Sequence, residues 1–259
     1  MSKHPFHLVD PRPWPITGAC GTLLLLSGFV RIFTKYDKIL IWLGLILLIL
    51  TISQWWRDVT REATIQGKHT SKVEDGMRIG MLLFIMSEVC FFFAFFWAYF
   101  HSSLSPNIEV GAKWPPIRII AIRPFDVPLL NTTVLLSRGA TITWAHMGLL
   151  RSERLEVHIS LGITISLGCL FTILQWIEYN FSTFSMADSV YGSTFFLATG
   201  FHGLHVLIGT LFIIVIWIRQ MLGHFSRTHH FGFEGRAWYW HFVDVVWLFL
   251  FLCIYWWGI

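Results

Sequence analysis

The sequence predicts an all-α, polytopic membrane protein with seven transmembrane helices. The first observation is composition: 55% of the 259 residues are hydrophobic and only 13% are charged, against roughly 25% charged residues in soluble domains. The second is seven apolar runs, each long enough to cross a hydrocarbon layer of about 30 Å as a helix. The third is tryptophan at the ends of runs, as in the pair Trp55 and Trp56, which is typical of the membrane interface.

The first two runs are joined by a short charged turn. They extend over Pro15–Phe33 and Ile39–Trp56, and small residues in the first permit close packing against a neighbouring helix. The connector Arg57–Gly76 follows and carries the densest charge of the chain. We interpret it either as a solvated loop or helical extension, or as a surface for lipid headgroups or a partner.

The remaining runs alternate with loops of differing length. The third, Arg78–His101, precedes a proline-rich loop, Ser102–Pro128, which cannot form one continuous helix. The last four runs are Leu129–Leu150, His158–Tyr179, Val190–Ile218 and Ala237–Trp257.

Charge and cysteine usage exclude several function classes. The net charge of +4 comes from basic residues in the short loops between runs, so it indicates membrane topology and no nucleic-acid partner. All four cysteines lie inside apolar runs without paired spacing, which argues against a disulfide framework or a zinc knuckle. The first fifteen residues lack the apolar region of a cleavable signal. No nucleotide-binding, hydrolase or peptidase motif is present.

Glu88 is the main candidate for chemistry. It lies near the middle of the third run, where a charged group costs about 3 kcal/mol on insertion scales. Without a partner its neutral form is the cheaper state. It is therefore either a proton-handling or lipid-facing carboxyl, or a hydrogen-bonded acid inside the bundle. Arg138 reaches a similar depth in the fourth run, and we consider a pairing with Glu88, although the sequence leaves its partner open.

The histidines are the second candidate. His202 and His205 share one helical face, and together with His146 and His241 they could ligate a haem or metal. Interhelical hydrogen bonds are the alternative. His229 and His230 lie in a connector that suits a headgroup or partner contact, whereas His241 and Asp244 are spaced for a local hydrogen bond.

Several long blocks of sequence closely resemble subunit III of mitochondrial cytochrome c oxidase, in the haem-copper oxidase subunit III family. They include HLVDPRPWPITG at 7–18, LFIMSEVCFFFAFFWAYFHSSLSP at 83–106, YGSTFFLATGFHGLHVLIGT at 191–210 and HHFGFEGRAWYWHFVDVVWLFLF at 229–251. The resemblance follows essentially the whole chain in order.

The resemblance implies a two-plus-five arrangement of helices around a lipid-filled, V-shaped cleft. Residues 1–71 would hold the first two helices and residues 72–259 the other five. It also implies a non-catalytic core subunit of respiratory complex IV that has no metal, haem or copper of its own. Subunits I and II would carry those centres, transfer electrons from cytochrome c to dioxygen and pump protons.

The family's lipid contacts are carried over only where the residue matches. Its phospholipid positions correspond here to Arg61, His69, Glu88, Trp97, His101 and Trp256. Arg219 with His224 resembles a cardiolipin-type contact, and phosphatidylglycerol and phosphatidylethanolamine are the other implied lipids. Each polar position could instead be an ordinary interfacial anchor. Glu88 also falls on the family's carbodiimide-reactive carboxyl, and the family usually has a small residue where this chain has Arg138.

The resemblance places the chain in the mitochondrial inner membrane. Lys and Arg are more numerous in the loops on the side of the N-terminus, which predicts that the N-terminus lies in the matrix and the C-terminus in the intermembrane space. Expected partners are subunits I and II, small accessory subunits, membrane lipids and a respiratory supercomplex. We expect this chain to stabilise subunit I and to aid oxygen access and proton uptake. The alternative is an autonomous transporter or proton channel built around Glu88.

Overall fold

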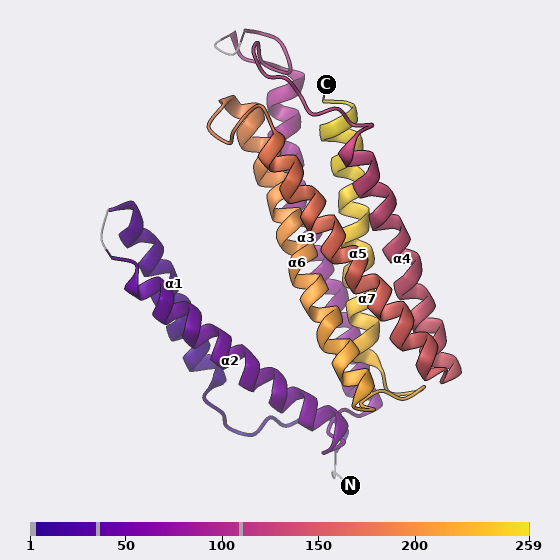
Figure 1. Cartoon of the computed structure of the whole chain (residues 1–259). Coiled ribbons are helices and arrows are strands. Elements are labelled where there is room, and N and C mark those ends of the chain that lie inside the picture. Colours follow the sequence, from indigo (N-terminus) through magenta and orange to yellow (C-terminus); the bar gives the residue numbers. More distant parts are fainter. Residues whose placement is uncertain (1–3, 35–36, 109–110, 259) are drawn as a thin grey trace. The chain divides into compact units, whose positions relative to one another are not determined.

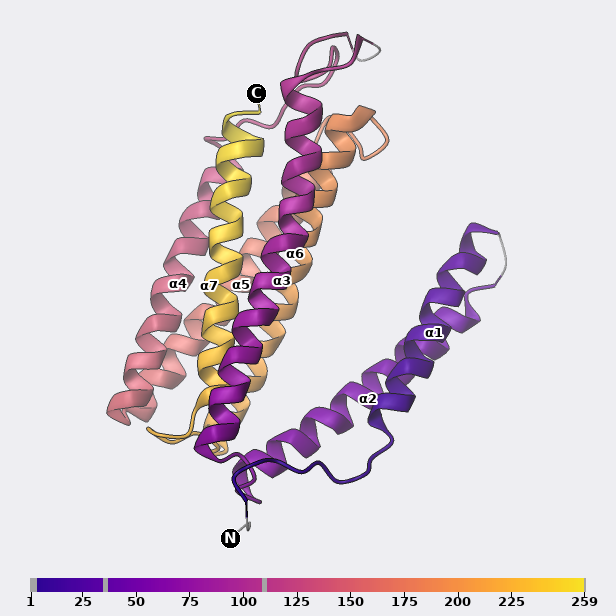
Figure 2. The same ribbon diagram turned by 180° about the vertical axis from the view of Figure 1, so that it is seen from behind.

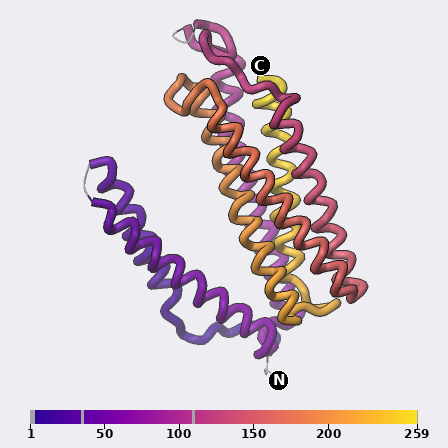
Figure 3. Tube along the Cα trace, viewed as in Figure 1, coloured from indigo at the N-terminus to yellow at the C-terminus, as the bar shows by residue number. Residues whose placement is uncertain are grey.

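The protein is all-helical in the computed structural model, which describes residues 4–34, 37–108 and 111–258 (Figures 1 and 3). The helices are α1 (Trp14–Phe33), α2 (Ile39–Thr64), α3 (Ser71–Leu104), α4 (Val127–Arg151), α5 (Arg154–Phe181), α6 (Ser189–Met221) and α7 (Phe231–Leu250), with a π-helical turn, η2 (Phe251–Trp256), continuing α7. The described residues form two compact units, Met1–Met77 and Arg78–Ile259.

The N-terminal unit is a helical hairpin followed by the start of α3. Helices α1 and α2 pack against each other along their length, and glycines at 21, 28 and 44 are buried between them. The connector expected at Arg57–Gly76 is mostly helical, because α2 continues to Thr64 and α3 begins at Ser71. The structure therefore shows helical extensions in this segment, and a surface for lipid headgroups or a partner stays a prediction.

The C-terminal unit is a bundle in which α4, α5, α6 and α7 form a closed ring of neighbours. Helix α3 lies beside α6 and α7, as Figure 2 shows from behind. Hydrogen bonds join α3 to both neighbours: Glu88 meets His205 of α6, and Arg78 meets Glu234 of α7. Side-chain contacts from α3 therefore reach both neighbours.

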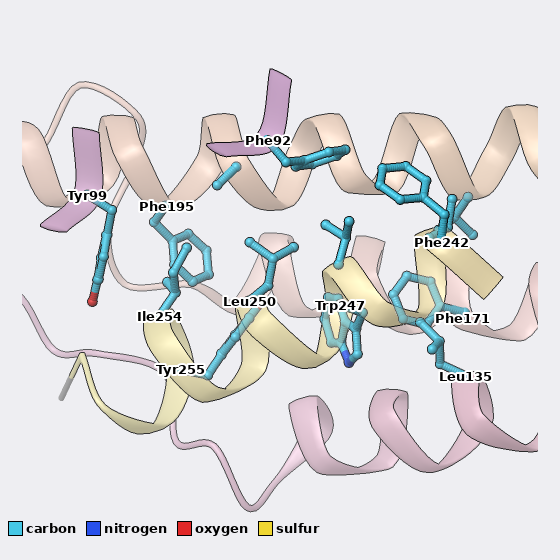
Figure 4. Packing of buried hydrophobic residues seen from close by; sticks show 14 of the residues in the cluster. Phe92, Tyr99, Leu135, Phe171, Phe195, Phe242, Trp247, Leu250, Ile254 and Tyr255 are labelled. Carbon is cyan, nitrogen blue, oxygen red and sulfur yellow. The ribbon is translucent and has the colours of Figure 1, made fainter. Parts of the chain in front are cut away.

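Aromatic side chains fill the core of this bundle. Figure 4 shows Phe195, Trp247, Leu250 and Tyr255 between the helices, and each is at most 1% exposed. Trp247 donates its indole N–H to the Thr132 hydroxyl at 3.0 Å, so the polar atom of this buried ring is satisfied.

Six of the described helices are long and apolar enough to cross a membrane by length and composition, and α4 is the one remaining helix among the seven described. Helix α4 is less apolar because its buried face carries Asn131, Thr132 and Arg138. Its 25 residues extend over about 37 Å at 1.5 Å per residue. Its length therefore suits a span, and neighbouring helices cover its polar groups.

Candidate functional site

Glu88 lies on the inward-facing side of α3. The residues three or four positions before and after it, Ile85 and Phe92, are half-buried and buried. Its Oε2 lies 2.8 Å from Nε2 of His205 on α6, and 22% of its side chain and 11% of the histidine side chain remain exposed. The acid is therefore hydrogen-bonded within the bundle, which was one of the two interpretations of the sequence.

The hydrogen bonds of His205 define where its protons lie. Nδ1 is 2.6 Å from the carbonyl oxygen of Phe201, and a carbonyl oxygen can only accept, so Nδ1 carries a proton and donates it. One further proton lies in the contact between Nε2 and Glu88. It belongs either to a neutral carboxylic acid or to an imidazolium facing a carboxylate. The pair has no net charge in both cases, which removes the cost of a lone charge at this depth.

Aromatic rings surround the Glu88–His205 pair. The rings of Phe92, Phe91 and Tyr239 lie 5.0, 6.1 and 6.3 Å from the imidazole centroid. Such an environment has few dipoles to solvate a charge and strengthens the electrostatic contact inside it. The arrangement can hold a proton in an apolar setting, and we name it the proton-sharing pair.

Arg138 is paired with Asp244, not with Glu88. It is fully buried, its Nη2 lies 3.4 Å from Oδ1 of Asp244, and its guanidinium lies over the rings of Trp240 and Phe171 at 4.3 and 5.2 Å. The pairing with Glu88 considered from the sequence is therefore wrong. Helices α4 and α7 are direct neighbours, and this contact gives Arg138 a nearer acid.

The histidines considered as haem or metal ligands do not act as one set in the described bundle. His202 places Nε2 3.2 Å from the carbonyl oxygen of Val243, and His205 bonds Glu88 and Phe201. Nδ1 of His241 is 3.9 Å from Asp244, which is too long for the expected local hydrogen bond. His146 lies instead beside His230, with ring centroids 5.6 Å apart.

Three residues expected to contact lipid are exposed in the C-terminal unit. Trp97 is 64% exposed and Trp256 is 56% exposed, and His101 is also exposed near the end of α3. Large apolar side chains open to the surroundings of a membrane helix suit acyl chains or partner helices.

Arg219 and His224 lie together at the end of α6. The amide of His224 donates to the carbonyl oxygen of Arg219 at 3.0 Å. Nε of Arg219 and Nδ1 of His224 are buried and have no hydrogen-bond partner among the described residues. Burial and the neighbouring guanidinium lower the pKa of His224. A neutral imidazole donor beside a guanidinium suits an anionic oxygen ligand.

Arg61 and His69 belong to the N-terminal unit. Arg61 is exposed near the end of α2, and His69 is half-buried in the turn before α3. The ring of His69 lies 5.4 Å from that of His7, and His7 approaches the buried carboxylate of Glu62 at 3.5 Å. The sequence did not indicate that the N-terminal arm meets this turn, because no motif links positions so far apart.

The chain matches one protein family along almost its entire length. The family model described as "Cytochrome c oxidase subunit III" matches residues 4–259. Proteins named cytochrome c oxidase subunit 3 are similar to it: that of Pisaster ochraceus is 62% identical over 99% of this chain and 98% of its own length. The Drosophila melanogaster protein is 60% identical over the same shares, and that of Heterololigo bleekeri is 57% identical over the full length of both chains.

Proposed function

Because this chain belongs to the cytochrome c oxidase subunit III family, and is thus a subunit of that respiratory oxidase, we propose that it supports the oxidase by holding phospholipids and a protonatable pair. Electron transfer and the haem and copper centres then belong to subunits I and II, and this chain stabilises subunit I. Family membership disfavours the alternative of an autonomous transporter or channel.

The observation that carries this proposal is the contrast between the two sides of α3. Leu82, Met86, Val89, Phe93 and Trp97 are exposed and recur every three or four residues, so they form one apolar stripe. The half-buried Glu88 lies on the opposite, inward side. Lipid acyl chains or partner helices cover the stripe in a membrane, while the carboxyl remains within reach of small apolar reagents.

Phosphate groups are the proposed partners of the basic residues. Arg219 and His224 offer buried donor nitrogens without a protein partner among the described residues, as a cardiolipin-type headgroup requires. Arg61, His69 and His101 lie near helix ends, where a phosphatidylglycerol or phosphatidylethanolamine headgroup would be found. The proposed location is the mitochondrial inner membrane, with the N-terminus in the matrix.

Lipid retention tests the headgroup sites. We expect the intact oxidase with Arg219→Gln to lose tightly bound anionic phospholipid, counted by native mass spectrometry after detergent washing. Arg227→Gln is the matched control, because Arg227 bonds the Arg151 carbonyl oxygen and the Ser152 hydroxyl and is outside the proposed lipid set. Equal lipid counts in both variants and the native oxidase would contradict the proposal.

Carbodiimide labelling tests the proton-sharing pair. Carbodiimides react with protonated carboxyls, so labelling reports whether Glu88 holds the proton. Replacing His205 with Phe removes the base, and we expect faster labelling of Glu88 near neutral pH than in the native oxidase. His241→Phe, which changes a histidine that does not contact Glu88, should leave the rate unchanged. If the two variants label at the same rate, His205 does not share the proton.

A further inference from the structure

A second polar cluster lies at the end of the bundle where α4 ends and α7 begins. His146 comes from α4, His230 from the residue before α7, and Glu234 from the first turn of α7. One ligand atom from each of the three side chains lies within 4.8 Å of the other two. The proton-sharing pair and the proposed lipid positions do not include these residues.

Each of the three side chains can offer an electron pair to a shared ion. Nδ1 of His230 is 3.0 Å from the carbonyl oxygen of Ser226; it must donate there, which leaves a lone pair on Nε2. Nε2 of His146 is buried without a hydrogen-bond partner among the described residues. Arg78 contacts Oε2 of Glu234 at 3.2 Å, so Oε1 remains for another ligand.

The spacing within this cluster matches metal ligands better than a hydrogen bond. Nε2 of His230 and Oε1 of Glu234 are 3.3 Å apart, beyond the usual range for an N–H···O bond. Two ligand atoms of a tetrahedral zinc ion, each about 2.0–2.1 Å from the metal, are separated by about 3.3 Å. The observed distance is therefore that of neighbouring ligands.

The groups behind the cluster are also those that orient metal ligands. A carbonyl oxygen that holds the remote N–H of a histidine and a hydrogen-bonded carboxylate are the usual supports of such sites. The ring of His146 stacks on Phe233 at 5.5 Å, which fixes the direction of its Nε2. Two imidazoles and one carboxylate form a common three-ligand set for zinc.

We propose that His146, His230 and Glu234 bind a divalent transition-metal ion of the zinc class, with water as the fourth ligand. The ion would join the end of α4 to the start of α7. Because the Arg78 guanidinium lies beside the carboxylate, it offsets part of the attraction for a cation. We therefore expect an exchangeable ion that a chelator removes, not one buried for the life of the complex.

Zinc stoichiometry in the intact oxidase tests this site. The complex is stripped with EDTA and equilibrated with Zn²⁺, and bound zinc is measured by mass spectrometry. His146→Gln and Glu234→Gln should each lower the content by one zinc per chain relative to the native complex. His158→Gln is the control, since this histidine on α5 also has a buried nitrogen without a partner but lies outside the cluster. It should bind as much zinc as the native complex.

A measurement on the unaltered oxidase keeps the test independent of variant folding. Crystals equilibrated with Zn²⁺ should show an anomalous peak at the zinc edge, within bonding distance of Nε2 of both histidines and Oε1 of Glu234. A map without a peak at this position overturns the proposal. So do His146→Gln and Glu234→Gln variants that bind as much zinc as the native complex.

Discussion

Arg138 and Asp244 depend on each other because both are buried. The guanidinium is fully enclosed, and 9% of the aspartate side chain is exposed. An isolated charge in such surroundings is costly, and a partner charge offsets that cost. The guanidinium also makes a cation–π contact with the ring of Trp240. This pair therefore ties α4 to α7 through electrostatics as well as packing.

Breaking this pair on one side should destabilise the subunit more than removing both partners. We expect Arg138→Met or Asp244→Leu alone to cost about 3–5 kcal/mol, because each leaves one buried charge unpaired. The double variant should recover most of that loss. The measurement is the temperature at which the subunit leaves the intact oxidase. A double variant that dissociates as early as the weaker single variant would contradict this prediction.

The sequence identified the unusual residues but not their partners. Glu88 and Arg138 were recognisable because a charged side chain inside an apolar run requires an explanation. His205 is 117 positions from Glu88, and Asp244 is 106 positions from Arg138. Glu88 and Arg138 reach a similar depth in their predicted spans, so the sequence allowed a contact between them. The rotation of each helix about its axis and the order of neighbouring helices decide which residues pair. Neither can be read from spacing along the chain.

Close packing of α1 and α2 is the main contact within the N-terminal hairpin. A Cβ on Gly44 would lie 2.5 Å from the backbone nitrogen of Leu25, and one on Gly28 would lie 2.6 Å from that of Ile41. Backbone atoms cannot move aside as flexible side chains can, so the two helices approach this closely only with glycine at these positions.

Gly44→Ala should therefore push the two helices apart. We expect a lower dissociation temperature and faster proteolysis of the α1–α2 hairpin in the intact oxidase, because the added methyl group meets backbone. Gly80→Ala is the matched control: it is also a glycine inside a helix, but nothing lies within 4 Å of its added Cβ. Alanine favours helix over glycine by about 1 kcal/mol, so the control should be neutral or stabilising. Equal effects of both changes would contradict the packing argument.

Helix positions were predictable from the apolar runs, whereas their ends were less so. Helices α2 and α3 extend beyond the runs that predicted them, to Thr64 and from Ser71. The charged residues there continue the helices beyond the apolar core. Hydropathy measures the thickness of the apolar layer, not the length of the helix, so it could not fix these boundaries.

The N-terminal arm is held to the turn between α2 and α3 by an ion pair. Lys68 lies 2.7 Å from Asp10, and this hydrogen bond is the main cause that lowers the pKa of Asp10 below 3.8. The ion pair therefore stabilises the folded arm fully above pH 3.8. This stabilisation is lost as the pH falls through the lower pKa that Asp10 has in the folded protein.

Acid should therefore release the N-terminal arm only below about pH 4. We expect hydrogen exchange of residues 5–12 in the intact oxidase to remain constant between pH 7 and 5, after correction for intrinsic rates, and to accelerate below about pH 4. Asp10→Asn should show faster exchange already at neutral pH, because its amide carries no charge. If hydrogen exchange of the native arm accelerates between pH 7 and 5, a group other than Asp10 determines its pH dependence.

Contacts between loops define the two ends of the C-terminal bundle. Arg227, in the α6–α7 connector, donates to the carbonyl oxygen of Arg151, the last residue of α4 before the α4–α5 turn. Thr183, between α5 and α6, donates to the Ile120 carbonyl oxygen in the α3–α4 connector at 3.1 Å. The α4–α5 and α6–α7 connectors therefore lie at one end of this bundle, and the α3–α4 and α5–α6 connectors lie at the other, as Figure 1 shows. The alternating spans predicted from the sequence require that arrangement.

Labelling from each side of the membrane follows from this arrangement. With a membrane-impermeant maleimide, Thr228→Cys in the α6–α7 connector should react only in inverted inner-membrane vesicles, because the excess of Lys and Arg predicts that this end lies in the matrix. Asn107→Cys in the α3–α4 connector should react only in mitoplasts. The native Cys20, Cys90, Cys169 and Cys253 lie within α1, α3, α5 and η2, where the bilayer shields them from the reagent, so the unaltered chain is the control. Labelling of both introduced cysteines from one side would refute the membrane topology, and a clean reversal of sides would refute only the orientation.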